Sequence, residues 1–217
     1  ITGVTLPITK YNYIVKDITK LAGVIRDAFR IAKEGRPGPV LIDIPKDVTA
    51  QKTEYTYVKP SEISRETAQI TNEAVNEAVS MIKESEKPFI FVGGGAVISG
   101  ARNELAEFAS KIDAPVADSL MGKGAFNGTD PRYTGMLGMH GTKTSNFAVM
   151  ECDLLVVVGA RFSDRVTGDT KRFAPNARIL QLDNDPAEIN KNIRVDASVI
   201  GDVREILKAL NARLDDM

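Results

Sequence analysis

Short apolar runs alternate with amphipathic helical segments over the last two thirds of this chain, and this alternation is the feature that most constrains its fold. Helical spacing of apolar residues marks 72–84, 101–112 and the stretch from Val203 onward, and between them come "PFIFVGGG", "APVADS", "DLLVVVGA" and "RILQLD". Strands that read as continuous apolar runs are covered on both faces, as in a parallel sheet between helices. The pattern predicts an α/β fold, a Rossmann-like parallel sheet with helices on both faces.

The first 46 residues carry a separate, smaller pattern. Asp17 can cap a helix whose apolar positions from Ile18 to Ala32 recur at helical spacing, and "PVLIDIP" follows as a short buried strand. Periodicity is absent from 47–70, where polar, charged and proline residues dominate, so an extended linker is expected there. The predicted organisation is a partial domain over 1–46, this linker, and a larger domain over 71–217.

Composition excludes several classes of protein. Lys and Arg number 28 and Asp and Glu 29, so the net charge of -1 provides no basic surface for nucleic acid or an anionic membrane. No apolar run approaches the roughly 18–20 residues of a membrane span, and one cysteine excludes an internal disulfide. We expect a cytoplasmic globular protein with no nucleic-acid or membrane partner. The chain begins with neither Met nor a signal-peptide pattern and is expected to be a piece of a longer protein.

The single histidine, His140, lies in the loop "GMLGMHG". Imidazole could serve as a general base there, and a loop packing residue is the plainer alternative. One histidine excludes a multi-histidine metal site, and the only available thiol partner, Cys152, begins an apolar run and is expected to sit against the core. The residues alone leave both roles of His140 open.

Small or polar residues follow the predicted strands, where a sheet of this kind has its ligand crevice. Gly93, Gly94 and Gly95 match neither the dinucleotide fingerprint nor a P-loop. The three glycines have two possible explanations: a ligand that lies against the main chain, or a plain turn from strand to helix.

Two further loops carry charge. Asp185 and Glu188 have capping-box spacing around a proline, which leaves Asp183 at the strand end to bind a hydroxyl group. In "GARFSDRVTGD", Arg161 and Arg165 could hold a diphosphate or stack on a ring. The alternative is a surface loop in which Arg165 pairs with a neighbouring aspartate.

Five segments occur in one order: "GRPGPVLIDIPKDV", "VGGG", "GMLGMHGT", "GARFSDRVTG" and "DNDPAEINKN". Together they closely resemble the catalytic subunit of the acetolactate synthase family. The resemblance implies that 1–46 end a pyrimidine-binding domain and that 71–217 form the central domain. Such enzymes condense two pyruvates, or pyruvate and 2-oxobutyrate, with loss of CO2 in branched-chain amino-acid biosynthesis. They use thiamine diphosphate and Mg²⁺ and carry a structural FAD that the net reaction does not need.

The resemblance places the FAD in the central domain and assigns contacts to it by matched motifs. These are Arg36, Gly93, Gly94, Gly95, Ser119, Leu120, Leu137, Gly138, Met139, His140, Gly159, Ala160, Arg161, Ser163, Arg165, Val166, Asp183, Asn184, Glu188, Asp202 and Val203. His140 is then implied to be a wall of the flavin site and not a proton-transfer residue. The resemblance departs at one position: many relatives have two aspartates after "GARF", whereas this chain has Ser163 and then Asp164, and serine can still donate or accept one hydrogen bond.

The resemblance also places the thiamine diphosphate and Mg²⁺ sites outside this segment. It therefore implies no catalytic residue and no metal ligand in this chain, and the isolated chain is expected to be inactive. The longer protein is expected to act on small 2-oxo acids as a homodimer or tetramer, and a regulatory small subunit and the preferred acceptor are left open. Two alternatives remain: another thiamine-dependent enzyme, such as glyoxylate carboligase or pyruvate oxidase, and a stand-alone nucleotide-binding module. The partial domain over 1–46 argues against the module, because its helix and strand have no sheet to join.

Overall fold

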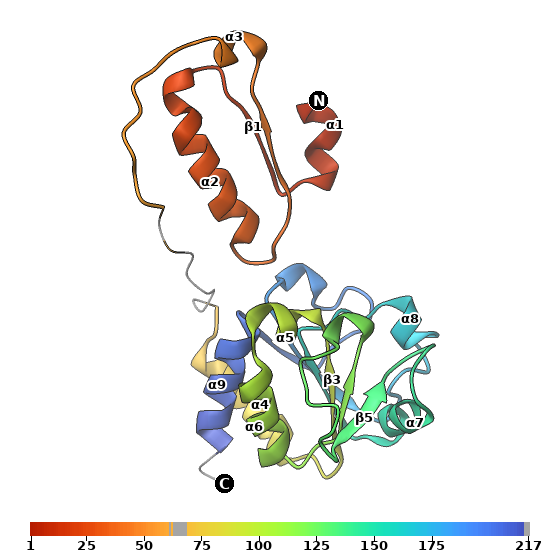
Figure 1. The fold of residues 1–217 in the computed structure, drawn as a ribbon. Helices are drawn as coiled ribbons and strands as arrows, with labels where there is room; N and C mark the ends of the chain where they lie inside the picture. The colour runs from red at the N-terminus through yellow and green to blue at the C-terminus, as the bar shows by residue number, and fades with distance from the viewer. Residues whose placement is uncertain (61, 63–68, 215–217) are drawn as a thin grey trace. The chain divides into compact units, whose positions relative to one another are not determined.

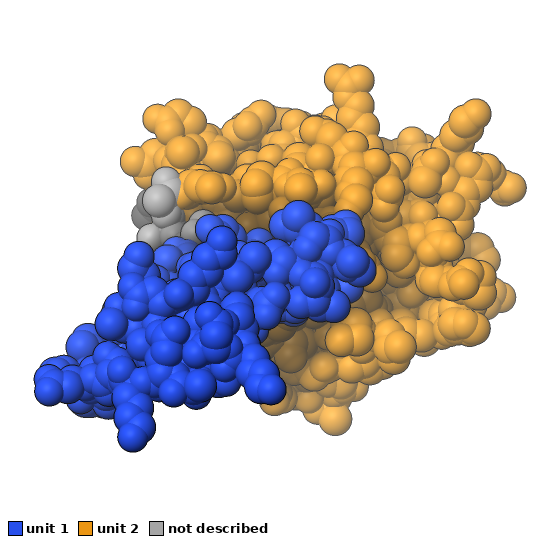
Figure 2. All heavy atoms as spheres, turned by 90° about the horizontal axis from the view of Figure 1, so that it is seen from above, with its two compact units in different colours: residues 1–65 blue, residues 66–217 orange. Residues whose placement is uncertain are grey.

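The computed structural model describes residues 1–60, 62 and 69–214, and the chain divides into two compact units, Ile1–Arg65 and Glu66–Met217 (Figure 2). The division falls inside the segment predicted as a linker, part of which, 61 and 63–68, lies outside the described residues. Residues 215–217 of the predicted larger domain also lie outside them. The assignment of the units to named domains stays a prediction.

Unit 1 is a small parallel sheet with one long helix. β1 (Tyr11–Ile14) pairs with β2 (Val40–Asp43), and α2 (Leu21–Lys33) connects them (Figure 1). The shorter elements are α1 (Thr2–Thr5), η1 (Leu6–Ile8), η2 (Ile18–Lys20) and α3 (Lys46–Thr49). Asp17 accepts a hydrogen bond from Thr19 N at 2.9 Å and caps η2, which runs into α2, so the predicted cap is confirmed. β1 was not predicted, and α3 occupies the first residues of the predicted linker.

Unit 2 is built on six parallel strands in the order β5-β4-β3-β6-β7-β8. They are β3 (Pro88–Val92), β4 (Val116–Asp118), β5 (Tyr133–Met136), β6 (Leu154–Val158), β7 (Arg178–Asp183) and β8 (Ala197–Ile200). Chain order thus runs outward from β3 to one edge and then from β6 to the other, which is the winding of Rossmann sheets. The predicted Rossmann-like fold is confirmed.

Apolar side chains cover both faces of this sheet. Alternate residues of β3 point to opposite faces, so that Ile90 joins the core on one side and Phe91 the core on the other. The first core includes side chains from α4 (Asn72–Lys83), α6 (Arg102–Lys111) and α9 (Val203–Leu214). The second includes Val149 of α7 (Lys143–Glu151) together with Phe162 and Phe173 of the segment after β6. Figure 1 shows α7 and α9 on different sides of the strands.

The remaining short elements of unit 2 are α5 (Gly94–Ser99), η3 (Leu120–Gly122), α8 (Asp164–Thr167) and η4 (Pro186–Glu188). Six elements of unit 2 are absent from the sequence prediction: the short α5, η3 and α8, and also β5, α7 and β8. β5 and β8 are four-residue edge strands, too short to show a period, and α7 has little segregation of polar from apolar residues. No helix in the described part of the chain is long and apolar enough to cross a membrane.

The backbones of the loops that follow β3 and β6 are in direct contact. These two neighbouring strands are where the strand order of the sheet changes direction. Gly93 N donates to Val158 O and Gly95 N to Gly159 O, both at 2.9 Å. A Cβ on Gly93 would lie 2.4 Å from Gly159 O, and one on Gly95 would lie 2.8 Å from Gly159 Cα. Gly159 itself has φ +58°. Packing of the two strand-end loops is therefore sufficient to require glycine at 93, 95 and 159.

We predict that Gly159→Ala lowers the free energy of unfolding by about 2–4 kcal/mol, because alanine would combine a left-handed backbone with a clash against the main chain of Gly95. Gly100→Ala is the matched control, since Gly100 has φ +67° and open space around it, and should cost only about 1 kcal/mol. Urea unfolding of the two variants measures the difference. Equal losses would contradict the close-contact explanation.

Candidate functional site

The predicted cofactor contacts of unit 2 lie at one edge of its sheet. Because the six strands are parallel, their carboxyl ends share that edge. The contacts follow the strands in turn: Gly93–Gly95 after β3, Ser119 and Leu120 after β4, Leu137–His140 after β5, Gly159–Val166 after β6, Asp183–Glu188 at and after β7, and Asp202 and Val203 after β8. Arg36 lies in unit 1, exposed, with its carbonyl accepting from Lys10 Nζ at 3.2 Å, and its contact with FAD stays a prediction.

The loops after β5 and β6 are joined through their main chains. Met139 N donates to Arg165 O at 2.8 Å, and a Cβ on Gly138 would lie 2.7 Å from Val166 Cα. Asn146 of α7 braces the first loop, accepting from Gly138 N and donating to Gly138 O, both at 3.0 Å. Asn146 was not predicted, because nothing in the sequence separates it from any other helical asparagine. Two predicted segments thereby form one continuous surface.

A tight turn presents Met139 and His140. Gly141 N donates to Gly138 O at 2.8 Å, and both side chains at the tip are exposed. Leu137, by contrast, belongs to the core, as does Val203, so either could reach a cofactor only through its main chain. Exposure leaves Met139 and His140 available to a ligand, and the wall role of His140 stays a prediction.

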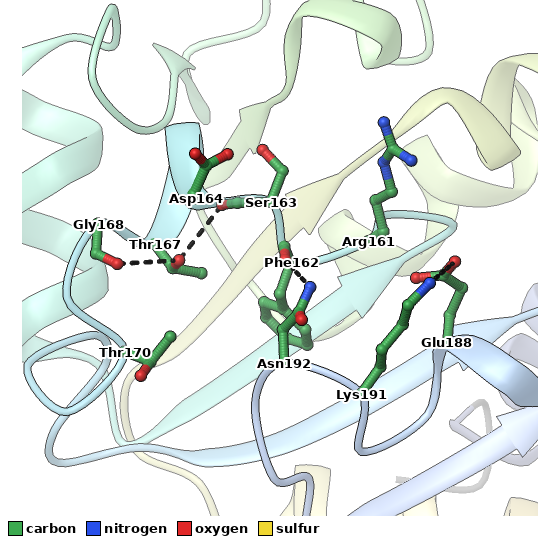
Figure 3. A pocket seen from close by; sticks show the side chains of 10 residues that line it. All are labelled: Arg161, Phe162, Ser163, Asp164, Thr167, Gly168, Thr170, Glu188, Lys191 and Asn192. Carbon is green, nitrogen blue, oxygen red and sulfur yellow. Dashed lines mark hydrogen bonds and ion pairs between the residues drawn. The ribbon is translucent and has the colours of Figure 1, made fainter.

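A polar hollow of about 440 Å³ opens beside the loop after β6 (Figure 3). It is lined by Arg161, Phe162, Ser163, Asp164, Thr167, Gly168, Thr170, Glu188, Lys191 and Asn192. Only Arg161, Ser163 and Glu188 of these were predicted. Buried Glu188 forms an ion pair with Lys191 at 3.0 Å, and Asn192 Nδ2 donates to Phe162 O at 2.6 Å, which ties the segment after β7 to the loop after β6. Sequence reasoning missed these partners because they come from two loops thirty residues apart.

The two arginines of the loop after β6 differ. Arg165 pairs with Asp164 at 3.7 Å, and both side chains are exposed, so the pair is worth little to stability. Within the described ranges, no carboxylate or carbonyl group pairs with the guanidinium of Arg161, which is exposed at the edge of the hollow. Arg161 therefore keeps its donors for a ligand.

Unsatisfied polar groups gather near the end of β7. The Oδ1 atom of Asn184 and the Oε1 atom of Gln181 are buried without a partner among the described residues. Burial raises the pKa of Asp183, and the nearby carboxylates of Asp185 and Glu188 act in the same direction. Buried polar atoms of this kind call for a hydrogen-bond donor from water or a ligand.

Two predicted contacts also serve as helix caps. Asp202 Oδ1 accepts from Arg204 N at 3.1 Å at the start of α9. Ser119 Oγ accepts from Gly122 N at 3.1 Å across η3. Asp185 Oδ1 accepts from Ala187 N at 3.0 Å, which confirms the predicted cap at this residue.

Cys152 and His140 lie at opposite edges of the sheet, so they do not form a nucleophilic pair. Cys152 precedes β6, whereas His140 follows β5. The thiol is buried, as predicted, and burial raises its pKa to about 12. Within 1–60, 62 and 69–214, no three His, Cys, Asp or Glu side chains lie close enough together to hold a metal ion.

Residues 75–210 match the family model of the thiamine pyrophosphate enzyme central domain. That stretch contains the whole six-stranded sheet and the edge just described. The chain belongs to the thiamine pyrophosphate enzyme family.

Several curated relatives of this chain are named acetolactate synthases. It is 45% identical over 214 residues to an acetolactate synthase of Arthrospira platensis, with 95% of this chain and 37% of that protein covered. It is 47% identical over 207 residues to an acetolactate synthase large subunit of Parasynechococcus marenigrum, covering 94% and 34%. A probable acetolactate synthase large subunit of Methanocaldococcus jannaschii is 44% identical over 223 residues, covering 98% and 37%. The resemblance to this family is confirmed, and the chain spans about a third of the length of these relatives.

We predict that Cys152 does not react with Ellman's reagent in the folded protein near pH 8, and that one thiol reacts after unfolding in guanidinium chloride. The raised pKa leaves almost no thiolate in the fold at that pH. The pKa of this thiol is about 8.5 in the unfolded chain and about 12 in the fold. The thiol therefore contributes its full stabilisation below pH 8.5, and this contribution is lost as the pH rises from 8.5 to about 12. Fast labelling of the native protein would contradict the burial of this thiol.

Proposed function

We propose that this chain is the FAD-carrying central part of an acetolactate synthase large subunit. The longer protein would condense two pyruvates, or pyruvate and 2-oxobutyrate, with loss of CO2 in branched-chain amino-acid biosynthesis, using thiamine diphosphate and Mg²⁺. The printed names of the relatives and their 44–47% identity support this activity. The observation that carries the FAD assignment is the uncommitted guanidinium of Arg161 beside a polar hollow at the carboxyl edge.

The residues at this edge fit the chemistry of FAD. A guanidinium group suits a diphosphate because it donates two parallel hydrogen bonds to phosphate oxygens. The buried Oδ1 of Asn184 lacks a donor, which the hydroxyl or amino groups of an adenosine would supply. The exposed tip of the β5 loop, with Met139 and His140, offers a surface for a ring.

In this proposal the flavin has a structural role. A bound flavin can exchange electrons, but the proposed condensation is redox-neutral overall. The chain's own residues would bind and orient the cofactor: Arg161 would hold the diphosphate, and Ser163 would offer a hydroxyl group. The Met139–Arg165 main-chain hydrogen bond keeps the loops after β5 and β6 together.

Two alternatives were open from the sequence. Another thiamine-dependent carboligase or oxidase would share this central domain, but the relatives reported above carry the name acetolactate synthase. A stand-alone nucleotide-binding module is disfavoured because the same residues form one part of longer proteins in these relatives. We further propose that the longer protein is a cytoplasmic homodimer or tetramer, which could associate with a regulatory small subunit.

We predict that the 217-residue chain binds FAD and that Arg161→Ala weakens binding about tenfold, the cost of about 1.4 kcal/mol expected for one charge-assisted contact. Lys171→Ala is the matched control, because Lys171 is also exposed and positively charged and lies in the same segment, but does not line the hollow. Flavin fluorescence titration measures both. Equal effects of the two substitutions would show that Arg161 contributes only general charge.

We also predict that the longer protein forms acetolactate from pyruvate when thiamine diphosphate, Mg²⁺ and FAD are supplied. A colorimetric assay for acetoin after acid treatment detects the product. Activity on glyoxylate with none on pyruvate would favour the carboligase alternative, and FAD binding without either activity would favour the nucleotide-binding module.

A further inference from the structure

One buried carboxylate at the carboxyl edge has no place in the proposed function so far. Asp118 is the last residue of β4, and its side chain is only 4% exposed. A buried carboxylate is retained only when charge and hydrogen bonds compensate the loss of water. Its partners therefore indicate what it does.

Asp118 belongs to a closed triangle of hydrogen bonds. Lys123 Nζ donates to Asp118 Oδ1 at 2.9 Å and to Tyr133 Oη at 2.7 Å. Tyr133 Oη in turn donates to Asp118 Oδ2 at 2.8 Å. The three residues come from the end of β4, the residue after η3, and the start of β5. These contacts hold the Lys123 ammonium in its charged form, since the hydrogen bonds to Tyr133 and Asp118 raise the pKa of Lys123.

The triangle encloses the turn that carries Ser119 and Leu120. The turn runs from Asp118 to Lys123, and it lies against the end of β3: Ser119 N donates to Val92 O at 2.9 Å. A Cβ on Gly122 would lie only 2.4 Å from that same carbonyl oxygen. The side chain of Leu120 projects outward and is 73% exposed. The turn thus holds two predicted cofactor contacts, Ser119 and Leu120, against the end of β3.

Asp118 is not itself available to a ligand. In a dinucleotide-binding Rossmann sheet, a carboxylate at the end of the second strand binds a ribose hydroxyl, and β4 is the second strand here. Both oxygens of Asp118 already accept hydrogen bonds from Lys123 and Tyr133, and the group is buried. The carboxylate serves as an internal anchor.

We propose that Asp118, Lys123 and Tyr133 are positioning residues that hold the Ser119–Gly122 turn in the shape required for cofactor binding. The proposal rests on the proposed function in so far as FAD is that cofactor. Lys123 is the informative member, because it is half exposed and lies at the far end of the turn from the carboxylate that it neutralises.

The test uses four variants of the 217-residue chain. Lys123→Met removes the cation and leaves Asp118 buried and unpaired, which destabilises the fold as well as releasing the turn. Asp118→Asn/Lys123→Met removes both charges, so stability should be largely recovered, while the hydrogen bonds of Lys123 across the turn are still lost. Lys123→Arg keeps a cation with similar reach. Arg178→Met is the matched control, because it breaks the Arg178–Glu84 pair, 2.8 Å long, at the amino edge of the sheet.

Three measurements are made on each variant: stability to urea, FAD affinity by fluorescence titration, and hydrogen exchange of the backbone over 119–124. We expect about a tenfold loss of FAD affinity and faster exchange confined to 119–124 in Lys123→Met and in the double variant. Lys123→Arg should restore both to within about threefold, and Arg178→Met should change neither. If Lys123→Met does not fold, the double variant carries the test.

If the double variant recovered both stability and FAD affinity, the proposal would be overturned. FAD affinity would then depend on the stability of the fold and not on the hydrogen bonds that Lys123 makes across the turn. Unchanged exchange over 119–124 in the double variant would overturn it as well. Failure of the unsubstituted chain to bind FAD would instead contradict the proposed function. In that case the exchange measurement alone decides whether the three residues hold the turn.

Discussion

The close main-chain contact between the ends of β3 and β6 is the constraint on which the rest of unit 2 depends. These two strands begin the two halves of the sheet, and the loops that leave them diverge to opposite sides. Glycine at 93, 95 and 159 lets the loops touch before they separate, since a side chain at any of the three would meet backbone. The loops after β4 and β5 follow on one side of this contact, and the loops after β7 and β8 follow on the other.

The carboxyl edge combines rigidity with unused hydrogen-bonding capacity. Its loops are fixed to one another by main-chain bonds, by the Asn146 brace and by the Asp118–Lys123–Tyr133 triangle. In contrast, the guanidinium of Arg161 and the Oδ1 atom of Asn184 have no partner among the described residues. Preorganised loops lose little freedom on binding, so groups of this kind can contribute most of their interaction energy to a ligand.

Sequence reasoning predicted the elements that have an apolar run, a clear amphipathic period or a cap motif, and missed elements that have none of these. The helices from Asn72 and Val203 and the strands of the sheet centre carry enough apolar residues to show a period, whereas β5 and β8 have four residues each and take their structure from a neighbouring strand. The motif "GMLGMHG" marked an important loop, but the local sequence did not reveal that the loop rests on the main chain of Arg165.

By itself, the sequence determined the α/β class, the strand-end positions of the candidate residues, the caps at Asp17 and Asp185, and the resemblance to the acetolactate synthase family. These follow from periodicity, residue type and motif order, which are local properties of the chain. The tertiary structure decided the strand order, the reason for the glycines, the separation of Cys152 from His140 and the pairing of Asp118 with Lys123 and Tyr133. Each of these depends on which distant segments become neighbours, and that is settled by packing the whole sheet between its helices, because local spacing carries no information about contacts across strands.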